Sequence, residues 1–517
     1  MTLSKQSIEW AVKFISEHAD GDLFPRLLEI DALAERAAEF ADLVASKQLK
    51  DLSHGSHRRF IVPKDEISYR QATQLDPQDS IILSALIYEY GSHIENRRMP
   101  ANKVFSYRFS PSTQNGLYDR ETSWNDFWTT ASTRARSSAK IIYCDISDFY
   151  NQIYHHVLEN QLLASGLPNQ ATKWIISLLE STTAGVSRGV PIGPHAAHLL
   201  AEASLIPVDN SMDTSGIDFV RYADDIIIFV DSDHQARRDL GRLAAILDKQ
   251  QRLTLQRHKT RFFERAEFIR YCSEMIEDRH INDEEDTLLK VVGRYSRGNP
   301  YQTISYDEIM PQDWALFSEE VLRAVIEEYI QADDVDFIRL RWFYRRLAQI
   351  GHPDAIDVTL ENLEALSPCF ASICAYLVSV QTIPPDQWRD IGSRLLQLLD
   401  EPDIKESEYF RLSILSIFTR NPHINHFRTL ASRYGSSDSS SKREILLAGA
   451  MGGAVDWLRE LKEGFDGMDP WQQRAFIYCC SQLPEDEKKY FLNRVTPPRP
   501  FETVLSKWSK AQRFSVG

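Results

Sequence analysis

Two adjacent aspartates between apolar runs constrain this chain more than any other feature of its sequence. Residues 219–225 read FVRYADD, and residues 226–230 read IIIFV. Two β-rich runs around a short polar centre predict a β-hairpin with both acids at its tip. Adjacent carboxylates repel each other, and a divalent cation removes that repulsion. A solvated turn is the commoner explanation for an isolated pair, so the motif needs support from elsewhere in the chain.

A third aspartate ends another apolar run. Residues 141–146 read IIYCDI, and residues 147–150 lead into a helical stretch from Asn151. An acid at the end of a buried strand is placed for a metal ion, although a helix cap more often explains it.

A loop with two glycines and two prolines, residues 187–194 (SRGVPIGP), precedes another helical run. Glycine lets such a backbone approach a ligand closely. Taken alone, this loop is more simply explained as the entry to a helix.

The composition is that of a folded protein without a membrane segment. The chain has 517 residues, of which 43% are hydrophobic, and a formal net charge of −15, so contact with nucleic acid must be local. Its six cysteines form no CxxC pair, which argues against a zinc site or a disulfide framework. The N-terminus has no apolar signal, and the apolar runs near the motifs are far shorter than the roughly 18 residues that span a bilayer. We therefore expect a cytoplasmic protein.

The pattern along the chain changes twice. Residues 1–60 predict a helical segment and a loop, residues 61–285 mix short strands with helices, and residues 290–517 predict helices only. Within the last part, Asp469-Pro470 and Pro484-Glu485 are typical helix starts, and residues 435–441 (GSSDSSS) predict a flexible loop. Stacked helix pairs are expected there, although no strict sequence period is present.

Taken in chain order, the three motifs resemble the palm domain of reverse transcriptases. The YADD sequence at 222–225 is the most specific part of this resemblance. It implies an α+β fold of fingers and palm over residues 61–285, followed by an all-α helical-repeat (HEAT-like) domain. It also implies a DNA polymerase that uses dNTPs and two Mg²⁺ ions, with Mn²⁺ as an alternative. Asp145, Asp224 and Asp225 would hold the ions and form the catalytic centre.

The resemblance also assigns contacts with the substrate. Lys64 and Arg70 would neutralise the incoming triphosphate, Tyr150 would exclude a ribose 2′-hydroxyl, and Lys259 would assist the pyrophosphate leaving group. Without the resemblance, surface cations and a core aromatic residue would explain the first three. The full set assigned to the substrate pocket is Lys64, Arg70, Asp148, Phe149, Tyr150, Ile192 and Gly193.

Two departures from most reverse transcriptases narrow the resemblance. Ile192 stands where a glutamine usually contacts the nucleotide, and a long helical part replaces the usual thumb. Both features are similar to the abortive-infection (AbiK-like) reverse transcriptases of bacterial antiphage defence. That group implies template-independent, protein-primed synthesis, a single-stranded DNA product attached to the enzyme, and a homo-oligomer. In that group the priming residue is a tyrosine ahead of the fingers, but no tyrosine precedes Tyr69 in this chain. The N-terminal loop offers only the hydroxyls of Ser53 and Ser56, so the identity of the priming residue stays open.

Two other functions compete with this prediction. A templated RNA-directed DNA polymerase would use the same three aspartates, but Ile192 and the acidic charge balance argue against it. A catalytically idle scaffold with a vestigial palm would be expected to have lost an aspartate, and all three are present.

Overall fold

The computed structural model describes residues 1–517 except 22, 66, 113–115, 120–123, 277–280, 297–303, 334, 381, 422, 425 and 514–517, and except the side chain of Tyr306. The chain forms two compact units, each assembled from three separate stretches. The first unit contains Met1–Gly21, Ala37–Arg58 and Thr73–Arg279, and the second contains Asp22–Arg36, Arg59–Ala72 and His280–Gly517. These stretches follow different boundaries from the three predicted segments, 1–60, 61–285 and 290–517, which stay a prediction about domains.

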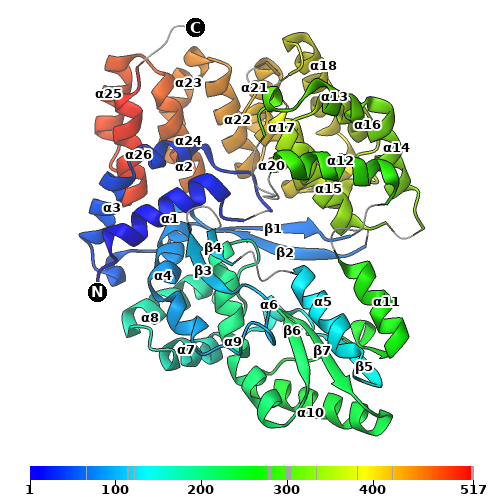
Figure 1. Ribbon diagram of the computed structural model, residues 1–517. Coiled ribbons are helices and arrows are strands. Elements are labelled where there is room, and N and C mark those ends of the chain that lie inside the picture. Colours follow the sequence, from blue (N-terminus) through cyan, green and yellow to red (C-terminus); the bar gives the residue numbers. More distant parts are fainter. Residues whose placement is uncertain are drawn as a thin grey trace. The chain divides into compact units, whose positions relative to one another are not determined.

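A four-stranded antiparallel sheet forms the centre of the first unit (Figure 1). Its strands lie in the order β6 (Phe219–Tyr222), β7 (Asp225–Val230), β5 (Lys140–Asp145) and β8 (Arg261–Glu264). The predicted hairpin is confirmed as β6–β7, and the predicted strand through residue 145 as β5. Strands β5 and β7 form because their β-branched runs, Ile141–Ile142 and Ile226–Ile228, are fully buried, whereas the edge strand β8 exposes Phe262.

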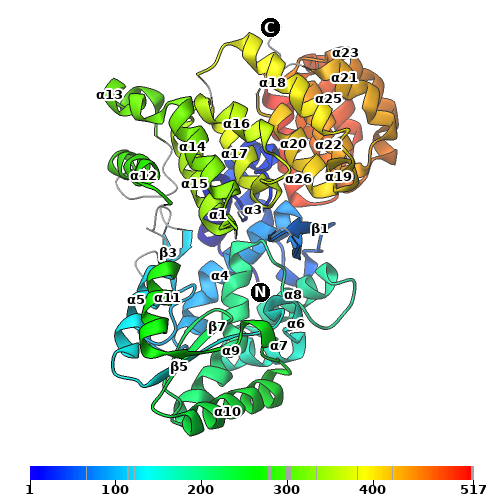
Figure 2. The ribbon, with the colours of Figure 1, turned by 90° about the vertical axis from the view of Figure 1, so that its right-hand side faces the viewer.

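Helices cover both faces of this sheet (Figure 2). On one face, α5 (Trp124–Ala135) and α11 (Arg265–Met275) share a core with Ile141, Ile227 and Phe263. Alternate strand residues point to the opposite face, where α10 (Asp233–Gln251) packs on β5 and β7 and also on α9 (His195–Thr214).

The first unit is completed by short strands and further helices. They are α1 (Lys5–His18), α3 (Ala37–Ala45), α4 (Pro77–Glu95), β3 (Phe109–Ser112), β4 (Gly116–Tyr118), α6 (Phe149–Gln152), α7 (His155–Ala164) and α8 (Asn169–Thr182).

The second unit joins a β-hairpin to the C-terminal helices. Strands β1 (Arg58–Pro63) and β2 (Tyr69–Gln74) bury Phe60, Val62 and Ala72 against Tyr409 and Leu412. The first residues of β1 correct the sequence prediction, because residues 58–60 were expected to be loop. Helix α2 (Leu28–Ala34) packs on α24 and α26 of the same unit.

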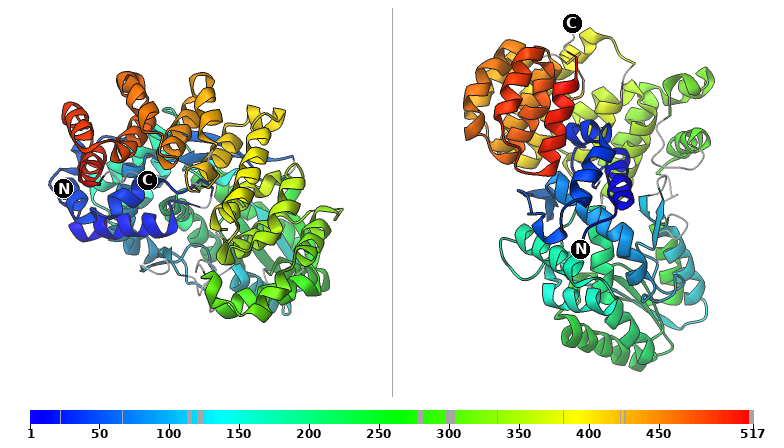
Figure 3. Two further views of the ribbon diagram at one scale, coloured as in Figure 1. Left: turned by 90° about the horizontal axis from the view of Figure 1, so that it is seen from above. Right: turned by 90° about the vertical axis from the view of Figure 1, so that its left-hand side faces the viewer.

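Within the described residues beyond 290, all regular elements are helices, as predicted (Figure 3). They are α12 (Asp283–Tyr295), α13 (Pro311–Trp314), α14 (Glu319–Ile330), α15 (Phe337–Ile350), α16 (Ile356–Glu361), α17 (Phe370–Ser379), α18 (Pro385–Leu398), α19 (Pro402–Glu406), α20 (Glu408–Phe418), α21 (Phe427–Arg433), α22 (Ser439–Met451), α23 (Val455–Leu461), α24 (Pro470–Cys479), α25 (Glu485–Arg494) and α26 (Pro500–Ala511). Helices α15, α17, α20, α22, α24 and α26 pack on one another in that order. The finer HEAT-like class stays a prediction.

Two local predictions in this part have different outcomes. Asp469 caps α24, because its side chain accepts the N–H of Gln472 and Pro470 follows it, as predicted. The predicted flexible loop 435–441 is wrong at its end: α22 begins at Ser439, and the Asp438 side chain accepts the N–H of Ser441. Serine-rich sequence is therefore helical here because a cap precedes it.

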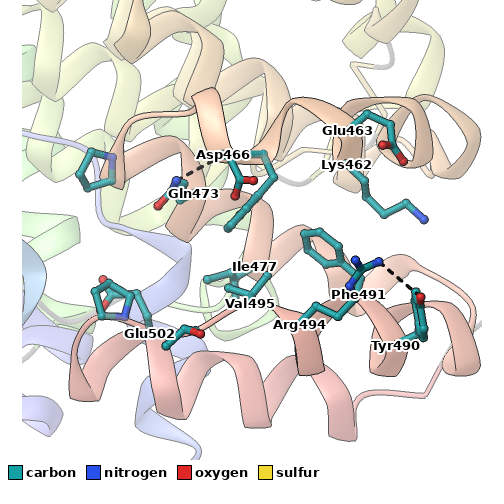
Figure 4. Close-up of a pocket in the computed structure, with 14 residues that line it drawn as sticks. Lys462, Glu463, Asp466, Gln473, Ile477, Tyr490, Phe491, Arg494, Val495 and Glu502 are labelled. Carbon is teal, nitrogen blue, oxygen red and sulfur yellow. Dashed lines mark hydrogen bonds between the residues drawn. The ribbon is translucent and has the colours of Figure 1, made fainter.

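Two further features concern the interior. All six cysteines are free and buried. A cavity of about 840 Å³ lies among the last helices, with Phe465, Ile477 and Phe491 beside the charged side chains of Arg494 and Glu502 (Figure 4).

Candidate active site

The sheet brings the three predicted aspartates together at one edge, which is formed by the end of β5 and the beginning of β7. Asp145 is the last residue of β5 and lies opposite Asp225, the first residue of β7, in the strand register. Asp224 lies in the turn before Asp225, and its carbonyl accepts the N–H of Ile146 at 3.1 Å. The antiparallel pairing of β5 with β7 therefore gathers acids that lie far apart in the sequence.

The carboxylates at this edge influence one another. Burial raises the pKa of Asp225 to about 7, and the negative charges of Asp224 and Asp145 act in the same direction. The hydroxyl of Tyr143 donates a hydrogen bond to Asp225 and opposes this rise. A proton or a cation would relieve the repulsion recorded at Asp225.

Lys259 lies beside these carboxylates, in the short helical turn η2 (Arg257–Lys259). Its Nζ donates to Oδ2 of Asp145 at 2.6 Å. Burial alone would lower the pKa of Lys259, but the hydrogen bond and charge of Asp145 outweigh it, so the pKa lies above its ordinary value. The start of η2 is also fixed to β5, because the N–H of Gln256 donates to the carbonyl of Asp145 at 2.7 Å.

The chemistry of these side chains fits a divalent cation. Carboxylate oxygens are the ligands that Mg²⁺ and Mn²⁺ prefer. Oxygens of Asp145 and Asp225 are engaged by Lys259 and Tyr143, and among the described residues no group of three or more His, Cys, Asp or Glu side chains is already arranged as a metal site. Each of these two hydrogen bonds uses one carboxylate oxygen, Oδ2 of Asp145 and Oδ1 of Asp225.

The turn that carries Asp224 is held in an unusual backbone conformation. Ala223 has a φ of 50°, which is uncommon for a residue other than glycine. Its N–H donates to the hydroxyl of Ser106 at 2.8 Å, and its carbonyl accepts from Nη1 of Arg221 at 2.8 Å. Side chains thus fix both polar groups of the residue that precedes the acid pair.

Arg221 belongs to a fully buried network of charges. Its guanidinium donates to Asp209 at 2.7 Å and 2.6 Å and to Glu202 at 2.9 Å and 3.2 Å, and both acids lie on α9. Arg98 also donates to Glu202, at 2.8 Å, and the Ser106 hydroxyl donates to it at 2.6 Å. Sequence reasoning missed these residues. The available signal was a charged residue inside an apolar strand and two acids seven positions apart in the apolar run of α9.

The residues after β5 adopt a tight turn. Asp148 has a φ of 49°, is exposed, and accepts hydrogen bonds from the side chains of Asn151 and Gln152 at 2.7 Å and 3.1 Å. Phe149 is buried. The predicted pocket residues Asp148 and Phe149 therefore have separate environments, and their contact with a nucleotide stays a prediction.

Tyr150 takes part in an aromatic cluster. Its hydroxyl lies 2.7 Å from Nδ1 of His198, whose ring stacks on Tyr107 with a centroid distance of 4.1 Å. Burial raises the pKa of Tyr150 well above its ordinary value, so this hydroxyl stays protonated. The cluster fixes the ring of Tyr150, and its predicted role as a sugar gate remains a prediction.

The glycine loop lies at the start of α9. Gly189 and Gly193 have φ values of 104° and 131°, which other residues rarely adopt. The carbonyl of Ile192 accepts the N–H of Thr73 at 2.8 Å. The predicted loop-to-helix arrangement is confirmed, because α9 begins at His195.

Lys64 and Arg70 belong to the second unit. Lys64 lies in the β1–β2 turn, where its N–H donates to the carbonyl of Ser68 at 2.9 Å. Arg341 of α15 donates to the carbonyl of Lys64 at 2.7 Å. The predicted triphosphate contacts of both residues stay predictions.

A family model matches the part of the chain that contains this site. Residues 62–276 match the family model described as "Reverse transcriptase (RNA-dependent DNA polymerase)". This stretch is similar to reverse transcriptase domains. It contains the three aspartates, Lys259 and the glycine loop, and the chain is a nucleotidyltransferase of the DNA polymerase class.

Other comparisons add little to this assignment. No curated protein matches the sequence. A solved structure, "Structure of apo telomerase from Candida Tropicalis", is similar at 10% sequence identity with a TM-score of 0.33, over 84% of this chain and 70% of that chain. A likeness at this level assigns no function. Among the described residues, no helix is both long and apolar enough to cross a bilayer.

Proposed function

We propose that the chain is a divalent-cation-dependent DNA polymerase of the abortive-infection reverse transcriptase type. Its synthesis would be template-independent and primed from protein, and would serve antiphage defence in the cytoplasm. The observation that carries the polymerase assignment is the convergence of Asp145, Asp224 and Asp225 on one sheet edge inside the stretch that matches the reverse transcriptase family. The resemblance of Ile192 and of the helical C-terminal part to that group supports the finer assignment.

The chemistry follows from these side chains. Two Mg²⁺ ions, or Mn²⁺ in their place, would activate the attacking hydroxyl and neutralise the triphosphate of a dNTP. Asp145, Asp224 and Asp225 would hold the ions. Lys259, whose raised pKa keeps it charged at neutral pH, would donate a proton to the leaving pyrophosphate or stabilise its negative charge.

The remaining predicted residues would position the nucleotide. Lys64 and Arg70 would contact the triphosphate, and Tyr150 would lie against the sugar. Ile192 and Gly193 would border the base, where an aliphatic side chain provides no hydrogen bond to a template. We infer a homo-oligomer and a single-stranded DNA product that stays attached to the enzyme.

The first test is nucleotide incorporation without primer or template. Purified protein receives labelled dNTPs and Mg²⁺, and products are separated with and without protease treatment. We expect a heterogeneous, protease-sensitive ladder. Asp224→Asn should reduce incorporation at least about 100-fold, the scale of losing one group that stabilises developing charge. Asp248→Asn, at an exposed acid of α10, is the matched control. Equal incorporation by the two variants would contradict the catalytic role of Asp224, and no incorporation by the unaltered chain would favour the scaffold.

A templated polymerase is the alternative that one observation favours. The matched family is described as RNA-dependent DNA polymerases. Extension of an added RNA–DNA primer-template, with no product in its absence, would move the protein to this class. The predicted role of Ile192 would then be wrong.

A further inference from the structure

The glycine loop of the matched stretch is in contact with a segment near the N-terminus. Helix α1 ends at His18, and Asp20 and Gly21 then lie against His195 and Gly193. A Cβ atom placed on Gly21 would lie 2.0 Å from the carbonyl oxygen of Gly193. No side chain larger than hydrogen fits at position 21 unless one of the two backbones moves.

A hydrogen bond adds to this contact. The N–H of His195 donates to the carbonyl of Asp20 at 2.8 Å. His195 is the first residue of α9, and its N–H is one of the donors that a helix cannot satisfy internally. Pro194 precedes it and provides no side-chain cap. The carbonyl of Asp20 therefore serves as the cap from a distant part of the chain.

The loop is held from a second side as well. The N–H of Thr73 donates to the carbonyl of Ile192 at 2.8 Å. Two positions of the loop, Ile192 and Gly193, and the first residue of α9, His195, are thus each in contact with backbone from elsewhere in the first unit. Their position depends on residues 20, 21 and 73 rather than on the loop alone.

We infer that the Asp20–Gly21 segment is a brace that positions the nucleotide-binding loop, and that Gly21 is a positioning residue for the incoming dNTP. This inference rests on the proposed polymerase function. A methyl group at position 21 would need a shift of about 1 Å to reach an acceptable contact, and misplacement on this scale costs up to about 100-fold in rate. The effect should fall on nucleotide binding, because the aspartates lie on other elements.

The test compares Gly21→Ala with Gly241→Ala in untemplated dNTP incorporation. Gly241 lies on α10, and a Cβ there would meet nothing within 4 Å. We expect Gly21→Ala to raise the KM for dNTP about 10-fold or more relative to Gly241→Ala, with a smaller change in kcat. An unchanged KM would overturn the inference, whatever the change in kcat.

A second pair of variants tests the hydrogen bond without crowding the loop. His195→Pro and His195→Ala both remove the imidazole, but only proline removes the N–H that Asp20 accepts. Proline suits the first position of a helix, and Pro194 has the extended backbone that a following proline requires. We expect a higher KM for dNTP in His195→Pro than in His195→Ala. Equal KM values in this pair would overturn the inference.

The unaltered chain separates this inference from the function on which it rests. If it incorporates no nucleotide with or without a primer-template, the proposed function fails. If it is active and either variant pair shows equal KM values, only the brace fails.

Discussion

At the scale of single residues, Arg221 connects the stability of the domain to the geometry of its active site. Its side chain is fully buried, contacts Glu202 and Asp209, and holds the carbonyl of Ala223. Taking one partner from such a group leaves buried charges without compensation. The same side chain thus stabilises α9 against β6 and fixes the turn before Asp224.

We predict that Arg221→Gln lowers the free energy of unfolding by about 3–5 kcal/mol, because Glu202 and Asp209 lose their shared partner. Chemical denaturation monitored by circular dichroism measures this change. Arg237→Gln, at an exposed position of α10, should change it by less than about 0.5 kcal/mol. A loss at Arg221 as small as the control would contradict the role of the network.

Asp20 gives stability a dependence on pH. Burial raises its pKa to about 7, while the nearby hydroxyl of Ser80 acts in the opposite direction. In the unfolded chain the group titrates near pH 4, so the folded state binds the proton more tightly. Its contribution to stability is complete below pH 4 and is lost as pH rises through about 7.

Asp20→Asn should therefore stabilise the protein at pH 8 and have little effect at pH 4. The difference is at most about 4 kcal/mol, which corresponds to about three pKa units. Thermal unfolding of both proteins across this pH range measures it. Asp231→Asn, at an exposed acid, serves as the control. A pH-independent difference at Asp20 would contradict the assigned cause.

At the scale of elements, the sequence predicted those strands and helices whose apolar residues follow a regular spacing. Strands β5 and β7 and helix α10 have apolar patterns that identify them without a structure. The grouping of Asp145 with Asp224 and Asp225 came from the order of motifs and their resemblance to a known palm. Partners of the hairpin β1–β2 were not predictable, because alternating Phe60 and Val62 would suit any apolar surface. The ion pairs of Arg221 with Glu202 and Asp209 were not predicted either, because this pairing depends on tertiary contacts.

The end of α15 offers a prediction at this scale. Gly351 terminates the helix with a φ of 61°, and a Cβ there would lie 2.6 Å from the carbonyl oxygen of Ser379. Gly453 has a similar φ of 68° after α22, but a Cβ there meets nothing within 4 Å. Gly453→Ala should cost about 1–2 kcal/mol through its backbone conformation alone.

Gly351→Ala should cost more than Gly453→Ala, because one of two backbones must also move. Urea denaturation of both variants measures the difference. Equal losses would show that the approach of Ser379 contributes nothing to the stability of this helix end.

At the scale of the whole molecule, the second unit depends on residues from both ends of the chain. Both carboxylate oxygens of Glu29, on α2, accept hydrogen bonds from Nη2 of Arg443, at 2.6 Å and 2.5 Å, and both side chains are buried. The hairpin β1–β2 likewise shares its core with α20. Two N-terminal stretches therefore complete a structure that consists mainly of C-terminal helices.

A double-mutant cycle tests this dependence. Glu29→Gln and Arg443→Met should each lower the free energy of unfolding by about 3–5 kcal/mol. Their combination should cost less than the sum, with a coupling of about 0.5–3 kcal/mol. The exposed pair Arg433–Asp400 should give a coupling of less than about 1 kcal/mol. A coupling at Glu29–Arg443 no larger than this would contradict the prediction.

Each unit combines stretches that are far apart in the sequence, and this affects how the protein folds during synthesis on the ribosome. Residues 59–72 emerge early, but Tyr409 and Leu412, which cover them, are synthesised far later. At about 5–20 residues per second, the hairpin waits for tens of seconds with Phe60 and Val62 exposed to water. The first unit can close over its own sheet in that interval, since its last stretch ends at residue 279. Translation order thus allows the four-stranded sheet to form first, while the apolar side chains of the hairpin β1–β2 stay uncovered until α20 is synthesised.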